Sequence, residues 1–79
     1  MSPTVLRWKD YRFFFFSREE ERVHVHVYCP QGEAKFWLEP DVVLARNHGL
    51  SDRQLSELLH VVKERSDDIR NAWRLHFGR

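Results

Sequence analysis

Two patterns of apolar and polar positions divide the chain into a first half of strands and a second half of helix. Residues 23–29 alternate valines with histidines, which is the period of two typical of a strand with two different faces. From residue 55 onwards, apolar residues recur at steps of three and four, as on one face of an amphipathic helix. The two patterns together predict an α+β fold.

Short aromatic and apolar runs between turn-forming residues predict a mostly antiparallel sheet of four or five strands. The turn at Pro30-Gln31-Gly32 favours a hairpin between the third and fourth strands. Phe13 to Phe16 ignore the alternation, so both faces of the second strand should be covered. We expect a single domain over residues 1–79, with strands at about 4–9, 12–17, 23–29, 33–38 and, unless a helical turn replaces it, 42–46.

The C-terminal pattern predicts helix over residues 51–77. Ser51 and Gln54 have the spacing of a capping box, which favours a helix start at this point. One helix of this length would reach about 39 Å, whereas a six-residue strand reaches about 20 Å. The helix should therefore break near Ser66, where Ser66, Asp67 and Asp68 could cap a second helix, or extend onto another chain.

The expected sheet has two chemically different faces. The helix should cover the face that carries Val23, Val25, Val27, Ala34, Phe36 and Leu38. The opposite face should then present an aromatic floor with cations and imidazoles: His24, His26, Tyr28, Lys35, Trp37 and alternate phenylalanines of the second strand. Such a floor can stack unpaired bases, and a large apolar patch of this kind is also typical of protein–protein interfaces.

Composition narrows these alternatives only in part. The 79 residues contain one cysteine, Cys29, so no disulfide can form within the chain, and a reducing compartment such as the cytoplasm is expected. No apolar run is long enough to span a membrane, and the first residues do not read as a signal peptide. Thirteen basic against twelve acidic residues give a net charge of +1, which is not the strong basic excess of many nucleic-acid binders.

The histidine pair has three interpretations. As acid and base, His24 and His26 would carry out metal-independent RNA cleavage, because imidazole gains and loses protons near neutral pH. Lys35, Arg46 or His48 would then hold a phosphate, and Tyr28 and Trp37 would contact the substrate or a partner. As metal ligands, the pair would need His48, Glu33 or an acid from residues 19–21. No such set has a diagnostic spacing, so no metal or cofactor is expected. In the third interpretation, the rings fill an interface.

Several motifs, in order along nearly the whole chain, resemble a family of small bacterial and archaeal domains of unknown function. They are Pro3-Thr4-Val5-Leu6, Tyr11-Arg12-Phe13-Phe14-Phe15, His24-Val25-His26-Val27, Ala34-Lys35-Phe36-Trp37-Leu38-Glu39-Pro40, Gly49-Leu50-Ser51 and Ala72-Trp73. The resemblance implies a compact α+β domain whose gene often lies beside that of another small domain, as in toxin–antitoxin pairs. Family members commonly have proline before the first histidine, where this chain has Val23. The family has no agreed catalytic residues, so no residue role is carried over.

Two functions are therefore expected from different classes. The first is a component of a prokaryotic toxin–antitoxin-like pair that binds RNA, or cleaves it without a metal, through the histidine-bearing face. The alternative is a non-enzymatic module that forms a homodimer or binds a small partner protein through its aromatic face. The sequence leaves open whether the protein is an enzyme.

Overall fold

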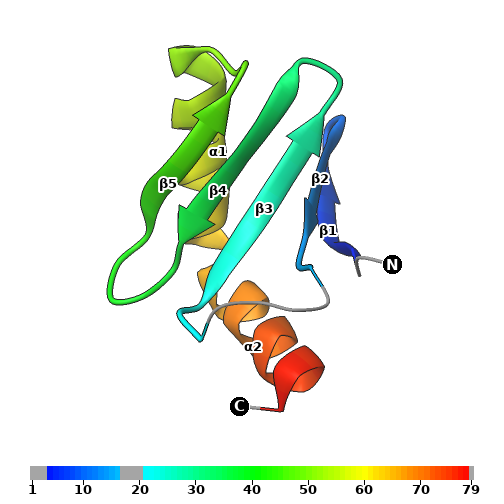
Figure 1. Ribbon diagram of the computed structural model, residues 1–79, viewed down its shortest axis with the longest axis vertical. Helices are drawn as coiled ribbons and strands as arrows, with labels where there is room; N and C mark the ends of the chain where they lie inside the picture. The colour runs from blue at the N-terminus through cyan, green and yellow to red at the C-terminus, as the bar shows by residue number, and fades with distance from the viewer. Residues whose placement is uncertain (1–3, 17–20, 79) are drawn as a thin grey trace.

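A computed structural model describes residues 4–16 and 21–78, and these residues form a sheet followed by two helices (Figure 1). Within them, the five strands form one antiparallel sheet in chain order. This confirms the α+β fold predicted from the sequence. The elements are β1 (Thr4–Trp8), β2 (Tyr11–Phe14), β3 (His24–Cys29), β4 (Gly32–Trp37), β5 (Val43–His48), α1 (Asp52–Glu64) and α2 (Ser66–Phe77).

Two strands differ by more than one residue from the expected ranges. The second strand was expected to reach Ser17, which lies outside the described residues, and β2 ends at Phe14. The fifth segment is a strand that continues to His48, two residues beyond the expected end. The turn falls later because the Asn47 side chain bonds both the amide and the carbonyl of Leu50, each at 3.1 Å, and Gly49 takes a positive φ of 86°. His48 is therefore a strand residue.

The central hairpin pairs β3 with β4 without a break in register. Val25 lies opposite Phe36, and Val27 lies opposite Ala34. These four residues are buried in the core together with residues of both helices. Since side chains alternate along a strand, the neighbouring pair of His26 and Lys35 must point to the other face. The helices therefore cover the valine face, as the alternation predicts.

The helical segment begins and bends where local chemistry requires it. The Ser51 hydroxyl accepts a bond from the Gln54 amide, and the Gln54 side chain accepts one from the Ser51 amide, which confirms the capping box. Helix α1 is about 20 Å long, close to the length of the strands behind which it runs in Figure 1. The break falls at Arg65, so Ser66 is the first residue of α2 and provides no cap. Arg65 still bonds Val61 and Ile69 through its backbone, so the chain bends with little loss of helical bonding.

Because of this bend, α2 closes one end of the sheet (Figure 1). Trp73 is buried there, with its ring centroid 5.2 Å from that of Phe15 and 4.4 Å from that of Phe77. The Arg70 side chain adds a 2.8 Å hydrogen bond to the carbonyl of Leu38, which follows β4. Among the described residues, no helix has the length and apolar character needed to cross a membrane.

The close approach between Gly32, at the start of β4, and the backbone of His48 generates a first prediction. A Cβ on Gly32 would lie 2.1 Å from the carbonyl oxygen of His48, which is backbone and cannot rotate away. Gly32→Ala should therefore lower the free energy of unfolding by roughly 1–3 kcal/mol, as overpacking commonly does. Urea unfolding followed by tryptophan fluorescence measures this. Gln31→Ala, an exposed change in the same turn, is the matched control, and equal midpoints for the two variants would contradict the prediction.

Candidate functional site

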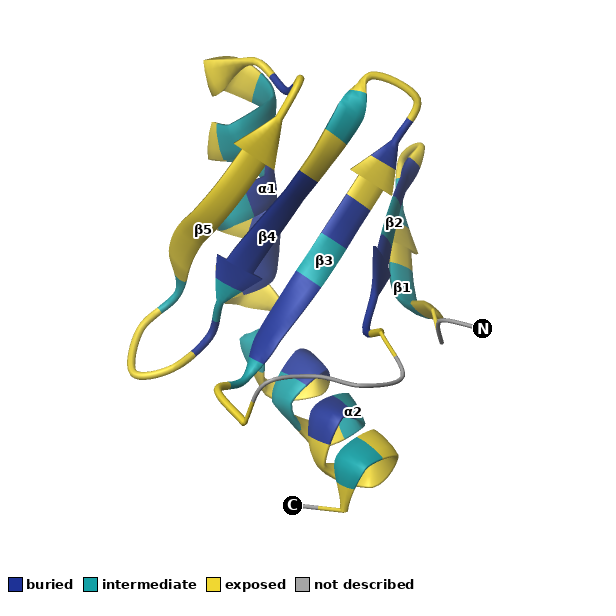
Figure 2. Ribbon diagram, viewed as in Figure 1, coloured by how far each residue is buried: buried dark blue, intermediate teal, exposed yellow. Residues whose placement is uncertain are grey.

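The side chains that point away from the helices form a surface that we call the open face. Cross-strand pairing arranges them in two adjacent rows that run over all five strands. The first row holds Thr4, Phe14, His26, Lys35 and Arg46, and the second holds Arg7, Arg12, Tyr28, Glu33 and His48. Strand β5 closes both rows at one edge and is exposed along its whole length (Figure 2).

Positive charge gathers on the open face. The strands contain four cationic residues, and the register places all four on this side: Arg7, Arg12, Lys35 and Arg46. Glu33 is the one carboxylate that the strands contain. The helices, by contrast, carry five carboxylates and four Lys or Arg side chains. Among the strand residues, charge on the open face is therefore mostly positive, although the balance over the whole chain is only +1.

Aromatic rings lie beneath part of this charge. Phe14 is buried although no helix covers it, and the Arg12 guanidinium lies 4.8 Å above its ring. The His26 ring stacks on Phe14 at 5.5 Å and meets the edge of Phe16 at 4.4 Å. The first three phenylalanines of the run are therefore buried, with Phe13 and Phe15 in the core, whereas Phe16 is exposed.

Trp37 is less available for stacking than the sequence suggests. The Arg22 guanidinium lies 4.2 Å from its ring centroid, and the Lys35 ammonium lies 4.3 Å from it. Such cation–π contacts occupy the ring surface that a base would need. The open-face aromatic residues that remain well exposed are Tyr28, at 51%, and Phe16, at 46%.

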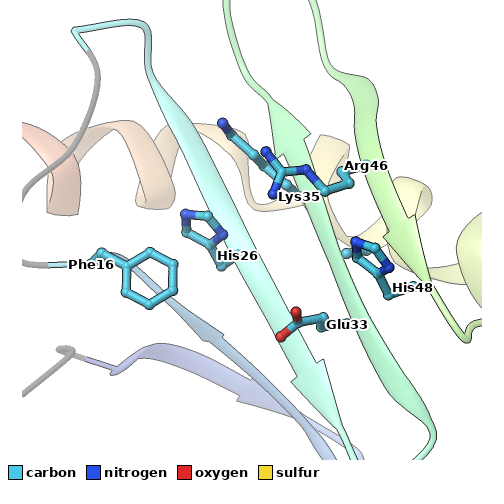
Figure 3. A pocket seen from close by; sticks show the side chains of 7 residues that line it. Phe16, His26, Glu33, Lys35, Arg46 and His48 are labelled. Carbon is cyan, nitrogen blue, oxygen red and sulfur yellow. The ribbon is translucent and has the colours of Figure 1, made fainter.

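A pocket lies where the two rows meet on strands β3, β4 and β5. It is lined by Phe16, His26, Glu33, Ala34, Lys35, Arg46 and His48 (Figure 3). In this view, the labelled strand side chains rise from one side of the sheet, with the helices behind it. The cavity volume of ≈ 130 Å³ is well below the roughly 300–1,000 Å³ of pockets for drug-sized ligands. The pocket thus suits one small polar group, such as a phosphoryl group, better than a whole metabolite.

His24 lies on the same side of the sheet but does not line the pocket. It is fully buried, because it begins β3 at the end of the sheet that α2 closes. Its ring is 5.1 Å from Trp73 and 5.4 Å from Trp37, and its Nδ1 lies 2.7 Å from the Arg22 carbonyl oxygen. The pocket therefore brings together four of the expected site residues, His26, Lys35, Arg46 and His48, and leaves out His24, Tyr28 and Trp37.

The residues considered for a metal do not form a ligand set in the described part of the chain. His26, Glu33 and His48 line the same pocket, yet no group of three or more His, Cys, Asp or Glu side chains there could hold an ion. Glu19 and Glu20, which the sequence offered as further ligands, lie outside the described residues.

Sequence reasoning missed two cations of the open face, Arg7 and Arg12. Their position depends on the register between β1 and β2, which pairs them directly with each other. One signal was available in the sequence: Arg12 and Phe14 are the neighbours of Phe13, which lies in the core, so both must point to the other face. That alternation assigns Arg12 to the face of His26, but Arg7 follows a β-bulge that the sequence does not reveal.

The different surroundings of the histidines generate a second prediction. His24→Ala leaves a cavity between the sheet and α2 and should cost about 2–4 kcal/mol, as for other large-to-small core changes. In a domain of this size, that lowers the melting temperature by roughly 10 °C or more. His48→Ala, at an exposed position, should stay within about 0.5 kcal/mol of wild type. Thermal unfolding followed by circular dichroism compares them, and equal melting temperatures would contradict a structural role for His24.

Comparison with known proteins places the chain in a family. No curated protein and no solved structure matches it. The family model described as a domain of unknown function, DUF4160, matches residues 10–74, which include most of both rows and the whole pocket. The chain therefore belongs to the DUF4160 family.

Proposed function

We propose that the protein binds single-stranded RNA on its open face, with a backbone phosphate in the pocket. The observation that carries this proposal is the separation of charge: four strand cations share one face with one carboxylate. Arginine and lysine on one surface form the electrostatic footprint of nucleic-acid binding. The small pocket at the centre of that surface matches a single phosphoryl group in size.

The arrangement of the cations supports an anionic ligand more strongly than their number does. Lys35 lies directly opposite Arg46, and Arg7 lies directly opposite Arg12. An anion placed among them would contact cations from two neighbouring strands at once.

The exposed aromatic residues favour a single strand over a duplex. Phe16 lines the pocket, and Tyr28 lies between Arg12 and Glu33 in the second row. Stacking of an unpaired base on an aromatic ring contributes about 1–3 kcal/mol, and paired bases are not available for it. Bases on either side of the bound phosphate would stack on these two rings.

The resemblance described above supplies a biological setting for this binding. In a prokaryotic toxin–antitoxin-like pair, we propose that this chain is the component that acts on RNA. The partner would then be the small protein encoded beside it.

A second candidate is a protein-interaction module, and the exposed rings of Phe16 and Tyr28 favour it. If the open face docks a protein, its charge selects an acidic partner. A second copy of this chain would bring two cationic faces together, and like charges across an interface oppose association. The occupant that fits this alternative is therefore a small acidic protein.

The RNA proposal predicts a specific loss of affinity. Replacing two exposed open-face cations, Arg7→Gln with Arg46→Gln, should weaken binding of a labelled single-stranded RNA at least tenfold at low salt. The slope of log K against log salt should fall by about 1.4, since each phosphate contact to a single strand contributes about 0.7. Fluorescence anisotropy over a salt series measures both quantities.

The matched control removes two exposed cations from the helical side, Arg53→Gln with Lys63→Gln, and changes the net charge equally. This pair should bind RNA nearly as wild type does. Equal losses for the two double variants would show attraction to net charge alone and would contradict a site on the open face.

The interaction alternative has its own prediction. Because the open face repels a copy of itself, the purified protein should remain a monomer in static light scattering at high micromolar concentration. A dimer that dissociates on Phe16→Ser or Tyr28→Ser would instead establish the open face as a homodimer interface. A dimer unaffected by either change would place self-association elsewhere.

A further inference from the structure

We propose that the pocket cleaves the RNA that it binds, without a metal, and that His26 and His48 are the acid–base pair. The inference rests on the proposed function, because the strand must first be held on the open face. It replaces the histidine pair expected from the sequence, His24 and His26, by one that only the fold brings together.

The first reason is that His24 and His26 leave no room for a phosphate between them. Their ring centroids are 5.0 Å apart in an edge-to-face contact, so the rings touch. His24 is also fully buried and contacts the Trp73 ring of α2. A proton donor in that position cannot reach a group held on the surface.

His26 and His48 have the opposite arrangement. They come from β3 and β5, whose backbones lie about 10 Å apart because β4 runs between them. Both line the pocket, and Figure 3 shows them on either side of the β4 side chains. In an in-line displacement, the attacking and leaving oxygens lie on opposite sides of phosphorus, so an acid and a base must flank the phosphoryl group. These two imidazoles flank the pocket in that way.

Two cations that line the same pocket fit the charge that develops during such a reaction. Lys35 is opposite His26 in the first row, and Arg46 is the next residue of that row. Lys35 is only 6% exposed, so its position is restricted by the surrounding side chains. Cations beside the non-bridging oxygens would stabilise the negative charge of the pentacoordinate transition state.

The side chains that line the pocket limit which group can act as the nucleophile. Among the described residues that line the pocket, none carries a hydroxyl or a thiol, and Cys29 is buried in the core on the other side of the sheet. A covalent enzyme intermediate through serine, threonine or cysteine therefore has no candidate in this lining. In the proposed reaction the nucleophile belongs to the substrate: it is the 2′-hydroxyl of the RNA, which lies beside the phosphate.

The step then balances without a co-reactant. One imidazole takes the proton of the 2′-hydroxyl as its oxygen attacks phosphorus. The bond from phosphorus to the 5′-oxygen breaks, and the other imidazole, protonated at the start, donates its proton to that oxygen. The products are a 2′,3′-cyclic phosphate and a 5′-hydroxyl end, and a proton has passed from one end of the reacting group to the other.

The test uses the full chain and a synthetic single-stranded RNA in the presence of a chelator, with cleavage ends identified by mass spectrometry. Wild type should produce 2′,3′-cyclic phosphate ends. His26→Gln and His48→Gln should each lower the rate by about 10²–10⁴-fold, the usual contribution of general acid–base catalysis. His60→Gln, which changes an exposed imidazole on α1, is the matched control and should cleave as wild type does.

Two further substrates make the result decisive. Replacing the scissile 5′-oxygen by sulfur removes the need for an acid, because a thiolate leaves unprotonated. This substrate should restore cleavage to one of the two single variants and not to the other. A 2′-O-methyl RNA cannot react, and both variants should bind it within about threefold of wild type.

The outcomes separate this inference from the proposed function. If wild type binds the 2′-O-methyl RNA but leaves the unmodified RNA intact, or if His48→Gln cleaves at the wild-type rate, the catalytic inference is wrong and RNA binding stands. If wild type binds neither RNA, both proposals fail.

Discussion

The alternation of side chains across the paired strands β3 and β4 is the constraint on which the rest of the structure depends. Val25 and Phe36 are opposite each other and fully buried beneath the helices. The next pair in the same register, His26 and Lys35, is thereby held on the opposite side. A slip of one residue would turn polar side chains into the core and valines into water, so burial of one face fixes the composition of the other. Burial of the valine face therefore holds His26 and Lys35 on the side where the pocket forms.

The open face also shows how a sheet with helices on one side can keep aromatic rings on the other. Arg12 lies over Phe14, and both Arg22 and Lys35 lie against Trp37. Each such contact contributes about 0.5–1 kcal/mol at exposed sites, and each removes ring surface from water. The cations therefore shield the aromatic layer while they supply charge. For the same reason, Phe14 and Trp37 are largely covered, and Tyr28 and Phe16 are the aromatic residues of the open face that stay well exposed.

Much of the fold could be predicted from the sequence because it rests on local periodicity. The strand pattern of residues 23–29, the capping box at Ser51 and the excess length of the helical segment are each local signals, and each has a counterpart in the structure. Alternation assigns His24 to a side of the sheet, but it does not say what covers that side. Its burial depends on Trp73, which is far away in the chain and reaches His24 only because the helix bends at Arg65.

The set of residues that line the pocket could not be predicted from the sequence. It requires the register of β4 with β5, which contains a β-bulge between Lys35 and Phe36. From the sequence, residues 42–46 were expected to form a strand or a helical turn, and the expected segment ended before His48. Without the register, Glu33 and His48 cannot be recognised as neighbours, and His48 cannot be recognised as the counterpart of His26.

Charged side chains are arranged differently on the helices and on the open face, and the difference concerns the function of the open face. In the helical segment, opposite charges are neighbours: Arg65 bonds Asp68 at 2.8 Å, and Arg70 lies 3.5 Å from Asp67. On the sheet, the same chain places Lys35 opposite Arg46. Like charges in directly opposed positions are an unfavourable arrangement in a sheet. Local arrangements that oppose stability are expected at functional sites, where a ligand compensates for them. An anionic group in the pocket would lie beside both Lys35 and Arg46, which line it from neighbouring strands.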